Sequence, residues 1–138
     1  MRIIELKQVP KDRQGSFHNN GVRLEPHEER TAKFLVLYGF SIEVIRPMNM
    51  PKMNNPDILM DGTIWEMKAP MRYNENTLKV RMKKASKQAK RIIFDFRNMK
   101  KDYKEAQSFV VKLFTGNREM RRMIILTKDK KVLDFYKR

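Results

Sequence analysis

Residues 55–70 read NPDILMDGTIWEMKAP, and this stretch decides how the middle of the chain folds. Residues 58–60 and 63–67 are strand-like, and Asp61-Gly62 stands between them. Asp-Gly between two apolar runs is the strong signal of a two-residue hairpin, because both turn residues need a positive φ. The sequence therefore predicts an antiparallel hairpin in which Met60 pairs with Thr63.

The same turn predicts a pair of acidic groups across the hairpin. With Asp61-Gly62 as the loop, Asp57 pairs with Glu66, and directly opposed residues hold their Cβ atoms about 4.5–5.5 Å apart. Two carboxylates so placed repel each other unless a divalent cation lies between them, and Mg²⁺ prefers such oxygen ligands. Lys68 shares the face of Glu66, while Trp65 is expected on the other face, in the core. An amine beside a metal site is suited to activate water and to stabilise a phosphate, so these parts suffice for phosphodiester hydrolysis.

A helix is expected before the hairpin, and two of its glutamates are candidates to face the sheet. Pro26 is a favoured first-turn residue, and Gly39 ends the apolar stripe. Glu28 shares the face of that stripe and is expected to point toward the sheet. Glu29 is placed to pair with Lys33 on the solvent side, at i, i+4. We therefore favour Glu28 as the inward carboxylate.

The remaining apolar patterns alternate between helical and strand-like periods. Such alternation predicts the α/β class, with a central mixed β-sheet flanked by helices. Residues 1–22 are expected to form an N-terminal strand and an irregular arm, and residues 23–138 one compact domain. The further strands are expected at residues 2–6, 41–46, 91–96, 123–127 and 132–135, and the further helices at residues 75–90 and 102–114.

The charge of the chain indicates a polyanionic partner. Its 31 Lys and Arg against 16 Asp and Glu give a formal charge of +15, and such a field fits nucleic acid best. A basic ribosomal-type protein or a membrane-surface binder is the alternative from charge alone. The absence of cysteine excludes disulfides and thiolate zinc sites. The longest apolar stretch, around residues 34–40, is too short to cross a bilayer, and we expect neither a membrane span nor a signal peptide.

Basic residues occupy the faces of the expected helix at residues 75–90 that its apolar stripe leaves open. Because this helix follows the hairpin, we expect its cations to track a phosphate backbone. Gln88 lies on the same helix, one turn from Lys84, and both are candidates to face the groove. The predicted nucleic-acid-binding residues are Lys79, Arg81, Lys83, Lys84, Lys87, Lys90 and Arg91.

These motifs resemble a known family of enzymes. Pro56-Asp57 followed by Glu66-Met67-Lys68 resembles the PD-(D/E)XK nuclease signature, in which a hairpin carries P-D and E-x-K. The wider pattern includes P-H-E-x-x-T-A at residues 26–32 and K-A-S-K-Q-A-K-R-I-I-F-D at residues 84–95. It is similar to the C-terminal tRNA nuclease domain of contact-dependent growth inhibition toxins and its relatives on mobile elements. The resemblance covers residues 26 to about 127.

The resemblance implies a three-layer, restriction-endonuclease-like PD-(D/E)XK fold and dependence on Mg²⁺ or Mn²⁺. It implies metal ligands at Asp57, Glu66 and Glu28, and catalytic roles for these three together with Lys68 and Gln88.

The resemblance also implies tRNA cleavage, so we expect a metal-dependent endonuclease that acts on RNA, with tRNA favoured over DNA. The alternatives are a DNA endonuclease of a mobile element and a non-catalytic basic nucleic-acid-binding protein. If the chain is a toxin, we expect it to be delivered from another cell, to act in the cytoplasm and to be covered by an acidic immunity protein.

Overall fold

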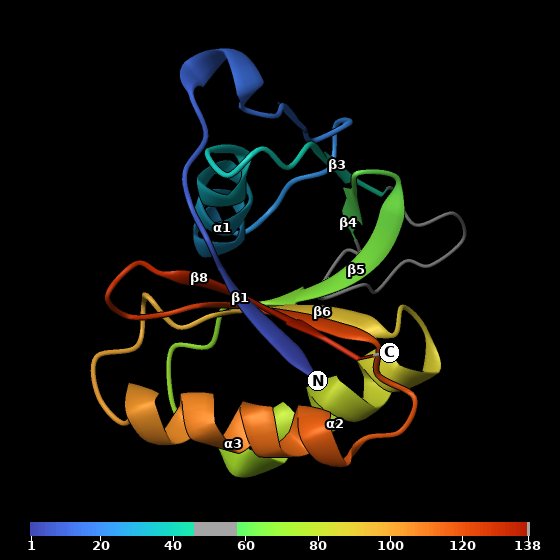
Figure 1. Ribbon diagram of the computed structural model, residues 1–138, viewed down its shortest axis with the longest axis vertical. Helices are drawn as coiled ribbons and strands as arrows, with labels where there is room; N and C mark the ends of the chain where they lie inside the picture. The colour runs from blue at the N-terminus through green and yellow to red at the C-terminus, as the bar shows by residue number, and fades with distance from the viewer. Residues whose placement is uncertain (46–57, 138) are drawn as a thin grey trace.

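The computed structural model describes residues 1–45 and 58–137. Within these residues eight strands form one curled sheet in the order β1-β8-β7-β6-β5-β4-β3-β2, and three α-helices accompany it, which confirms the mixed α/β class (Figure 1). The strands are β1 (Arg2–Leu6), β2 (Phe17–His18), β3 (Ile42–Val44), β4 (Ile58–Met60), β5 (Thr63–Lys68), β6 (Arg91–Asp95), β7 (Arg122–Leu126) and β8 (Val132–Tyr136). The helices are α1 (Pro26–Val36), α2 (Glu75–Lys87) and α3 (Tyr103–Gly116), with a short 3-10 turn at Lys11–Arg13.

The predicted hairpin is present as β4 and β5. Met60 pairs with Thr63 and Ile58 with Trp65, in the expected register. Asp61 and Gly62 both have positive φ, 52° and 81°, as the two-residue turn requires. The next pair, Asp57 with Glu66, includes a residue outside the described part of the chain, so that pairing stays a prediction.

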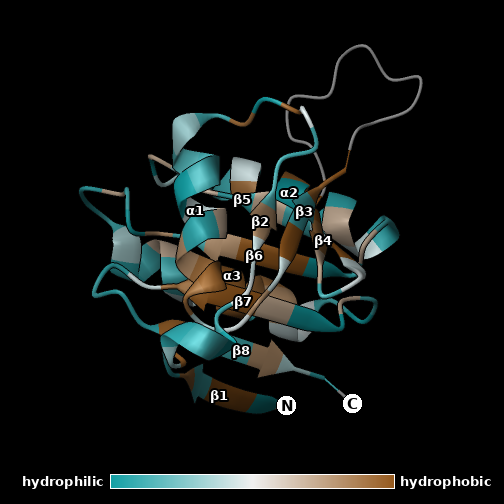
Figure 2. Cartoon of the chain, turned by 90° about the horizontal axis from the view of Figure 1, so that it is seen from above, coloured by the Kyte–Doolittle hydropathy of each residue, from teal (hydrophilic) through white to brown (hydrophobic). Residues whose placement is uncertain are grey.

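Strand β5 lies in the interior of the sheet, between β4 and the parallel strand β6. Helix α1 covers one face of the sheet, and α2 and α3 cover the other (Figure 1). Each face has its own apolar core: Trp65 and Met67 pack on the α1 side, and Ile92 and Phe94 pack on the side of α2 and α3. The strands of the sheet are largely hydrophobic, while α1 on the near side is largely hydrophilic (Figure 2).

The N-terminal segment is built into the sheet. The strand expected at residues 2–6 is β1, and it pairs antiparallel with β8. Strand β2 pairs parallel with β3. The predicted strand at residues 2–6 therefore forms one edge of the sheet, and the arm that was expected to be irregular contains the short strand β2 at the other edge. No described helix combines the length and the hydropathy that crossing a lipid bilayer demands.

Helix α2 is shorter than expected, which corrects the prediction that Gln88 lies on it. The helix ends at Lys87, and Gln88 is the C-cap with non-helical angles, φ −115° and ψ −84°. Only three residues separate the helix from β6, so the chain must reverse at once. It does so with Lys90 at φ 60°, whose N–H donates to the Ala85 carbonyl at 2.6 Å.

The turn supplies a test of the fold. We predict that Gly62→Ala lowers the free energy of unfolding by about 1 kcal/mol, since an added Cβ disfavours the left-handed region. No described atom lies within 4 Å of that Cβ, so the loss comes from the backbone alone. Gly116→Ala is the matched control: it is helical and equally open, and is expected to gain up to about 1 kcal/mol. Urea unfolding followed by circular dichroism measures the free energy of unfolding of both variants. Equal effects would contradict a positive φ at Gly62.

Candidate active site

Glu28 is a buried carboxylate on the first turn of α1, with 3% of its surface exposed. Its Oε1 accepts the Glu25 backbone N–H at 3.3 Å, while its Oε2 is buried without a hydrogen-bond partner among the described residues. Burial is the main reason why the pKa of Glu28 is raised. The expected orientations are confirmed, since Glu29 pairs instead with Lys33 at 3.4 Å.

Glu66 is buried on the opposite face of β5 from Trp65, and each has 1% of its surface exposed. Two cations of α2 approach its Oε1: the Arg81 Nη1 at 3.3 Å and the Lys84 Nζ at 3.6 Å. Trp65 belongs to the core beneath α1, as predicted. The alternation along β5 therefore separates a charged face from an apolar one.

Lys68 lies within electrostatic range of Glu28 and of Arg81. Its pKa is lowered, first by partial burial and then by the charge of Arg81, while the charge of Glu28 acts in the other direction. Lys68 therefore feels Glu28 from the α1 side and, from α2, the same Arg81 that pairs with Glu66. The structure thus places three of the predicted catalytic residues, Glu28, Glu66 and Lys68, in one electrostatic network.

Sequence reasoning gave no role to Asp95, which ties α1 to the sheet. Asp95 ends β6, is fully buried, and its Oδ2 accepts the Thr31 hydroxyl of α1 at 2.6 Å. Arg97 donates to the same carboxylate from Nε at 3.0 Å and from Nη2 at 2.8 Å, and its guanidinium lies 4.0 Å from the centre of the Phe34 ring. Thr31 is one helical turn after Glu28, so this clasp fixes the helix that carries it. Thr31 and Asp95 both fall in the quoted motifs, but their pairing depends on tertiary structure.

The predicted basic residues do not form a single stripe. Arg81 and Lys84 turn toward Glu66, whereas Lys79 lies over the Phe109 ring of α3 and Lys83 lines a groove between α2 and α3. The remaining residues of the set lie at the end of α2 or just after it: Lys87 and Lys90 are exposed, and Arg91 donates to the Ala89 carbonyl. The neighbouring Gln88 is exposed as well.

The predicted metal site is incomplete within the described residues. Asp57 lies outside them, and no three acidic or histidine side chains among residues 1–45 and 58–137 gather to hold an ion. Glu28 fits a ligand role best, because a buried carboxylate oxygen without a donor attracts a cation.

The buried charge of Glu28 gives a pH-dependent prediction. A carboxyl with a raised folded pKa binds its proton more tightly in the native state, so stability falls as pH rises from the unfolded value of 4.5 through the folded pKa. Glu28→Gln keeps the oxygen that accepts the Glu25 N–H and removes the charge. We predict that this variant melts a few degrees above the parent at pH 7 and like the parent below pH 4.5. Calorimetry at both pH values measures this; a variant less stable at pH 7 would contradict it.

The clasp gives a second prediction. Thr31→Val keeps the side-chain shape but leaves the buried Asp95 carboxylate without one donor, which is expected to cost about 1–3 kcal/mol. Thr115→Val is the matched control. Both hydroxyls contact a carbonyl one turn back, Thr31 that of His27 at 3.0 Å and Thr115 that of Val111 at 2.8 Å, but Thr115 is exposed and meets no carboxylate. We expect the control to change stability by less than about 0.5 kcal/mol. Denaturant unfolding measures the free energy of unfolding of both variants. Equal losses would contradict a stabilising role of the hydrogen bond between Thr31 and Asp95.

Comparison with known proteins gives one family match and one structural match. Residues 54–132 match the family model described as the contact-dependent growth inhibition CdiA C-terminal domain. The fold is similar to a chain of the CdiA-CT/CdiI toxin and immunity complex from Burkholderia pseudomallei, with a TM-score of 0.63 and 17% identity over 89% of this chain and 100% of that chain. None of the curated protein sequences matches. Since the family model spans more than half of its length, the chain belongs to the CdiA C-terminal domain family of contact-dependent growth inhibition.

Proposed function

We propose that the chain is a metal-dependent endonuclease that hydrolyses RNA phosphodiesters, with tRNA as the favoured substrate. The observation that supports it most is Glu28, a buried carboxylate with one oxygen that lacks a hydrogen-bond partner among the described residues. A fold does not retain such a group for stability, because burying it unsatisfied is unfavourable. It is retained where a ligand completes it, and the neighbouring Lys68 suits a phosphate.

Glu28 and Glu66, together with Asp57, would hold Mg²⁺ or Mn²⁺ at this site. Asp57 is needed because the described carboxylates do not make a complete site by themselves. When bound, the ion would supply Lewis-acid stabilisation of the phosphate and a bound water of lowered pKa. The same ligand set and the E-x-K strand support the finer proposal of a PD-(D/E)XK fold, with α1 on one side of the sheet and α2 and α3 on the other.

Lys68 would act on the attacking water and on the phosphate. Its lowered pKa makes the neutral amine more accessible than in an ordinary lysine, so Nζ is suited to accept a proton from water. In the charged form the same group stabilises negative charge on a phosphate oxygen. Arg81, which pairs with Glu66 at 3.3 Å, would neutralise that carboxylate rather than the phosphate.

The family and the structural match support a toxin that meets an immunity protein. The similar chain from Burkholderia pseudomallei is part of a toxin and immunity complex. Because this chain has a formal charge of +15, an acidic immunity protein would cover exposed basic residues such as Lys79, Lys83, Lys87 and Lys90. Delivery from another cell and action in the cytoplasm follow from this proposal.

The nuclease proposal predicts separate effects on cleavage and on binding. Lys68→Ala and Asp57→Ala are expected to lower the rate of tRNA cleavage by about 10²-fold or more, because each removes a group that acts in the transition state. Affinity for tRNA is expected to change less than about fivefold, since Asp57 carries no positive charge and Lys68 is only one of 31 Lys and Arg residues. Gel analysis of total tRNA digested with Mg²⁺ or Mn²⁺ measures the rates, and filter binding in EDTA measures affinity.

Lys104→Ala is the matched control, since it removes the same charge from an exposed position on α3. It is expected to cleave like the parent. Plasmid DNA digested under the same conditions distinguishes the DNA endonuclease, which would leave tRNA intact. Failure of the parent to cut RNA or DNA with either metal would support the binding protein and overturn the proposal.

A further inference from the structure

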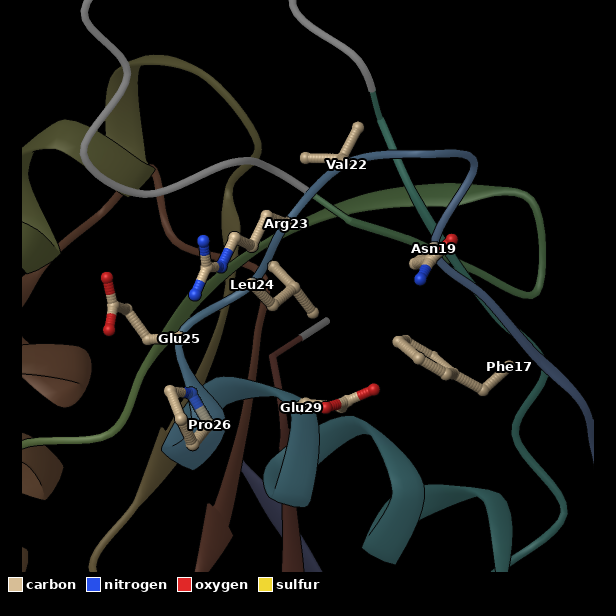
Figure 3. A pocket seen from close by; sticks show the side chains of 8 residues that line it. All are labelled: Phe17, Asn19, Val22, Arg23, Leu24, Glu25, Pro26 and Glu29. Atoms are coloured by element: carbon tan, nitrogen blue, oxygen red, sulfur yellow. The ribbon is translucent and has the colours of Figure 1, made fainter.

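A pocket of about 510 Å³ lies between the N-terminal arm and the beginning of α1. Its size falls in the range of small-molecule sites. Phe17, Leu24 and Glu29 approach the same space from β2, from the arm and from α1 (Figure 3). Among the described residues, those that line it are Phe17, Asn19, Val22, Arg23, Leu24, Glu25, Pro26 and Glu29.

The wall formed by the arm is held in place by hydrogen bonds to β3. The Ile42 N–H donates to the Ser16 carbonyl at 2.8 Å, which sets the position of β2. The Asn20 amide donates to the Val44 carbonyl at 3.0 Å, and Asn20 and Gly21 turn the chain with positive φ. The pocket is therefore preformed rather than left to an unanchored arm.

The pocket adjoins the candidate active site. Glu25 lines the pocket, and its backbone N–H donates to the Oε1 of Glu28 at 3.3 Å. Pro26 and Glu29 line it as well, on either side of Glu28 along the helix. A group bound here would thus lie next to the carboxylate that carries the proposed function.

The lining argues against a phosphate in this pocket. Although the chain has a formal charge of +15, the described residues of the lining include two carboxylates, Glu25 and Glu29, and one guanidinium, that of Arg23. Phe17 and Leu24 add apolar surface. Aromatic and aliphatic walls with carboxylate acceptors suit a flat, uncharged ring that donates hydrogen bonds.

We propose that this pocket binds one unpaired nucleobase of the RNA substrate, with the base against Phe17 and its exocyclic amine donating to Glu29. A carboxylate has several acceptor positions, so Glu29 can accept this amine beside its ion pair with Lys33. The proposal rests on the proposed function, and it selects bases that carry an amine over uracil. It thereby places base selection beside the scissile phosphate.

Cytosine and uracil differ at the amine, so oligoribonucleotides of ten cytidines or ten uridines test the proposal. Fluorescence anisotropy in EDTA measures the Kd of each for the full chain, without cleavage. The parent is expected to bind the cytidine oligomer about tenfold more tightly, the discrimination of one good base contact. Glu29→Gln is expected to abolish this preference, because an amide also donates to uracil. Phe17→Leu is expected to weaken both oligomers about fivefold through lost stacking.

Glu119→Gln, an exposed carboxylate between α3 and β7, is the matched control and is expected to keep the parent's preference. Equal affinity of the parent for both oligomers, or a preference that survives in Glu29→Gln, would overturn the pocket. If tRNA is cleaved without any preference, the pocket fails and the nuclease stands. A preference for the cytidine oligomer without any cleavage would mean that the pocket stands and the nuclease proposal fails.

Discussion

The pairing of β5 with a neighbour on each side constrains the whole candidate site. The Asp61-Gly62 turn sets its antiparallel pairing with β4, and on the other side Glu66 lies opposite Ile92 of the parallel strand β6. Because side chains alternate, a slip of one residue would exchange the two faces. Glu66 would then enter the apolar core beneath α1, and Trp65 would meet the cations of α2. The turn and the buried tryptophan therefore keep the charged side chain of Glu66 on the α2 side of the sheet.

The buried carboxylates of the described residues are satisfied to different degrees, and this separates structural roles from functional ones. Asp95 is bound by Arg97 and Thr31, and Asp134 is bound at two oxygens by Arg122, with the shorter distance 2.7 Å. Both have the donors that a buried charge needs for stability. Glu28 instead keeps an oxygen without a hydrogen-bond partner in the described part of the chain, close to a lysine whose pKa burial has lowered. Evolution toward stability alone would replace that carboxylate, so its retention favours a ligand.

Local signals in the sequence predicted the hairpin, the inward glutamate and most element positions, because turn chemistry and periodicity act over a few residues. The inward orientation of Glu28 followed from its spacing to the apolar stripe. Asp95 was missed because its partners, Thr31 and Arg97, come together only when α1 packs on the sheet. Gln88 was placed on a helix that in fact ends before it, since the short connection to β6 overrides helical spacing. The apolar stripe of α2 was predicted correctly, but which of its basic residues turn toward Glu66 and which toward α3 depends on tertiary packing.

Some of the cations form ion pairs within the fold, whereas others are exposed to solvent. Arg81 and Lys84 face Glu66, while Arg97 and Arg122 neutralise Asp95 and Asp134, so these four cations are largely committed within the fold. Exposed lysines such as Lys83, Lys87 and Lys90 remain to meet a polyanion. Counterion release makes such exposed contacts the source of salt-dependent affinity. Affinity and chemistry would then reside in different residues, which allows an acidic partner to cover the lysines without entering the buried site around Glu28.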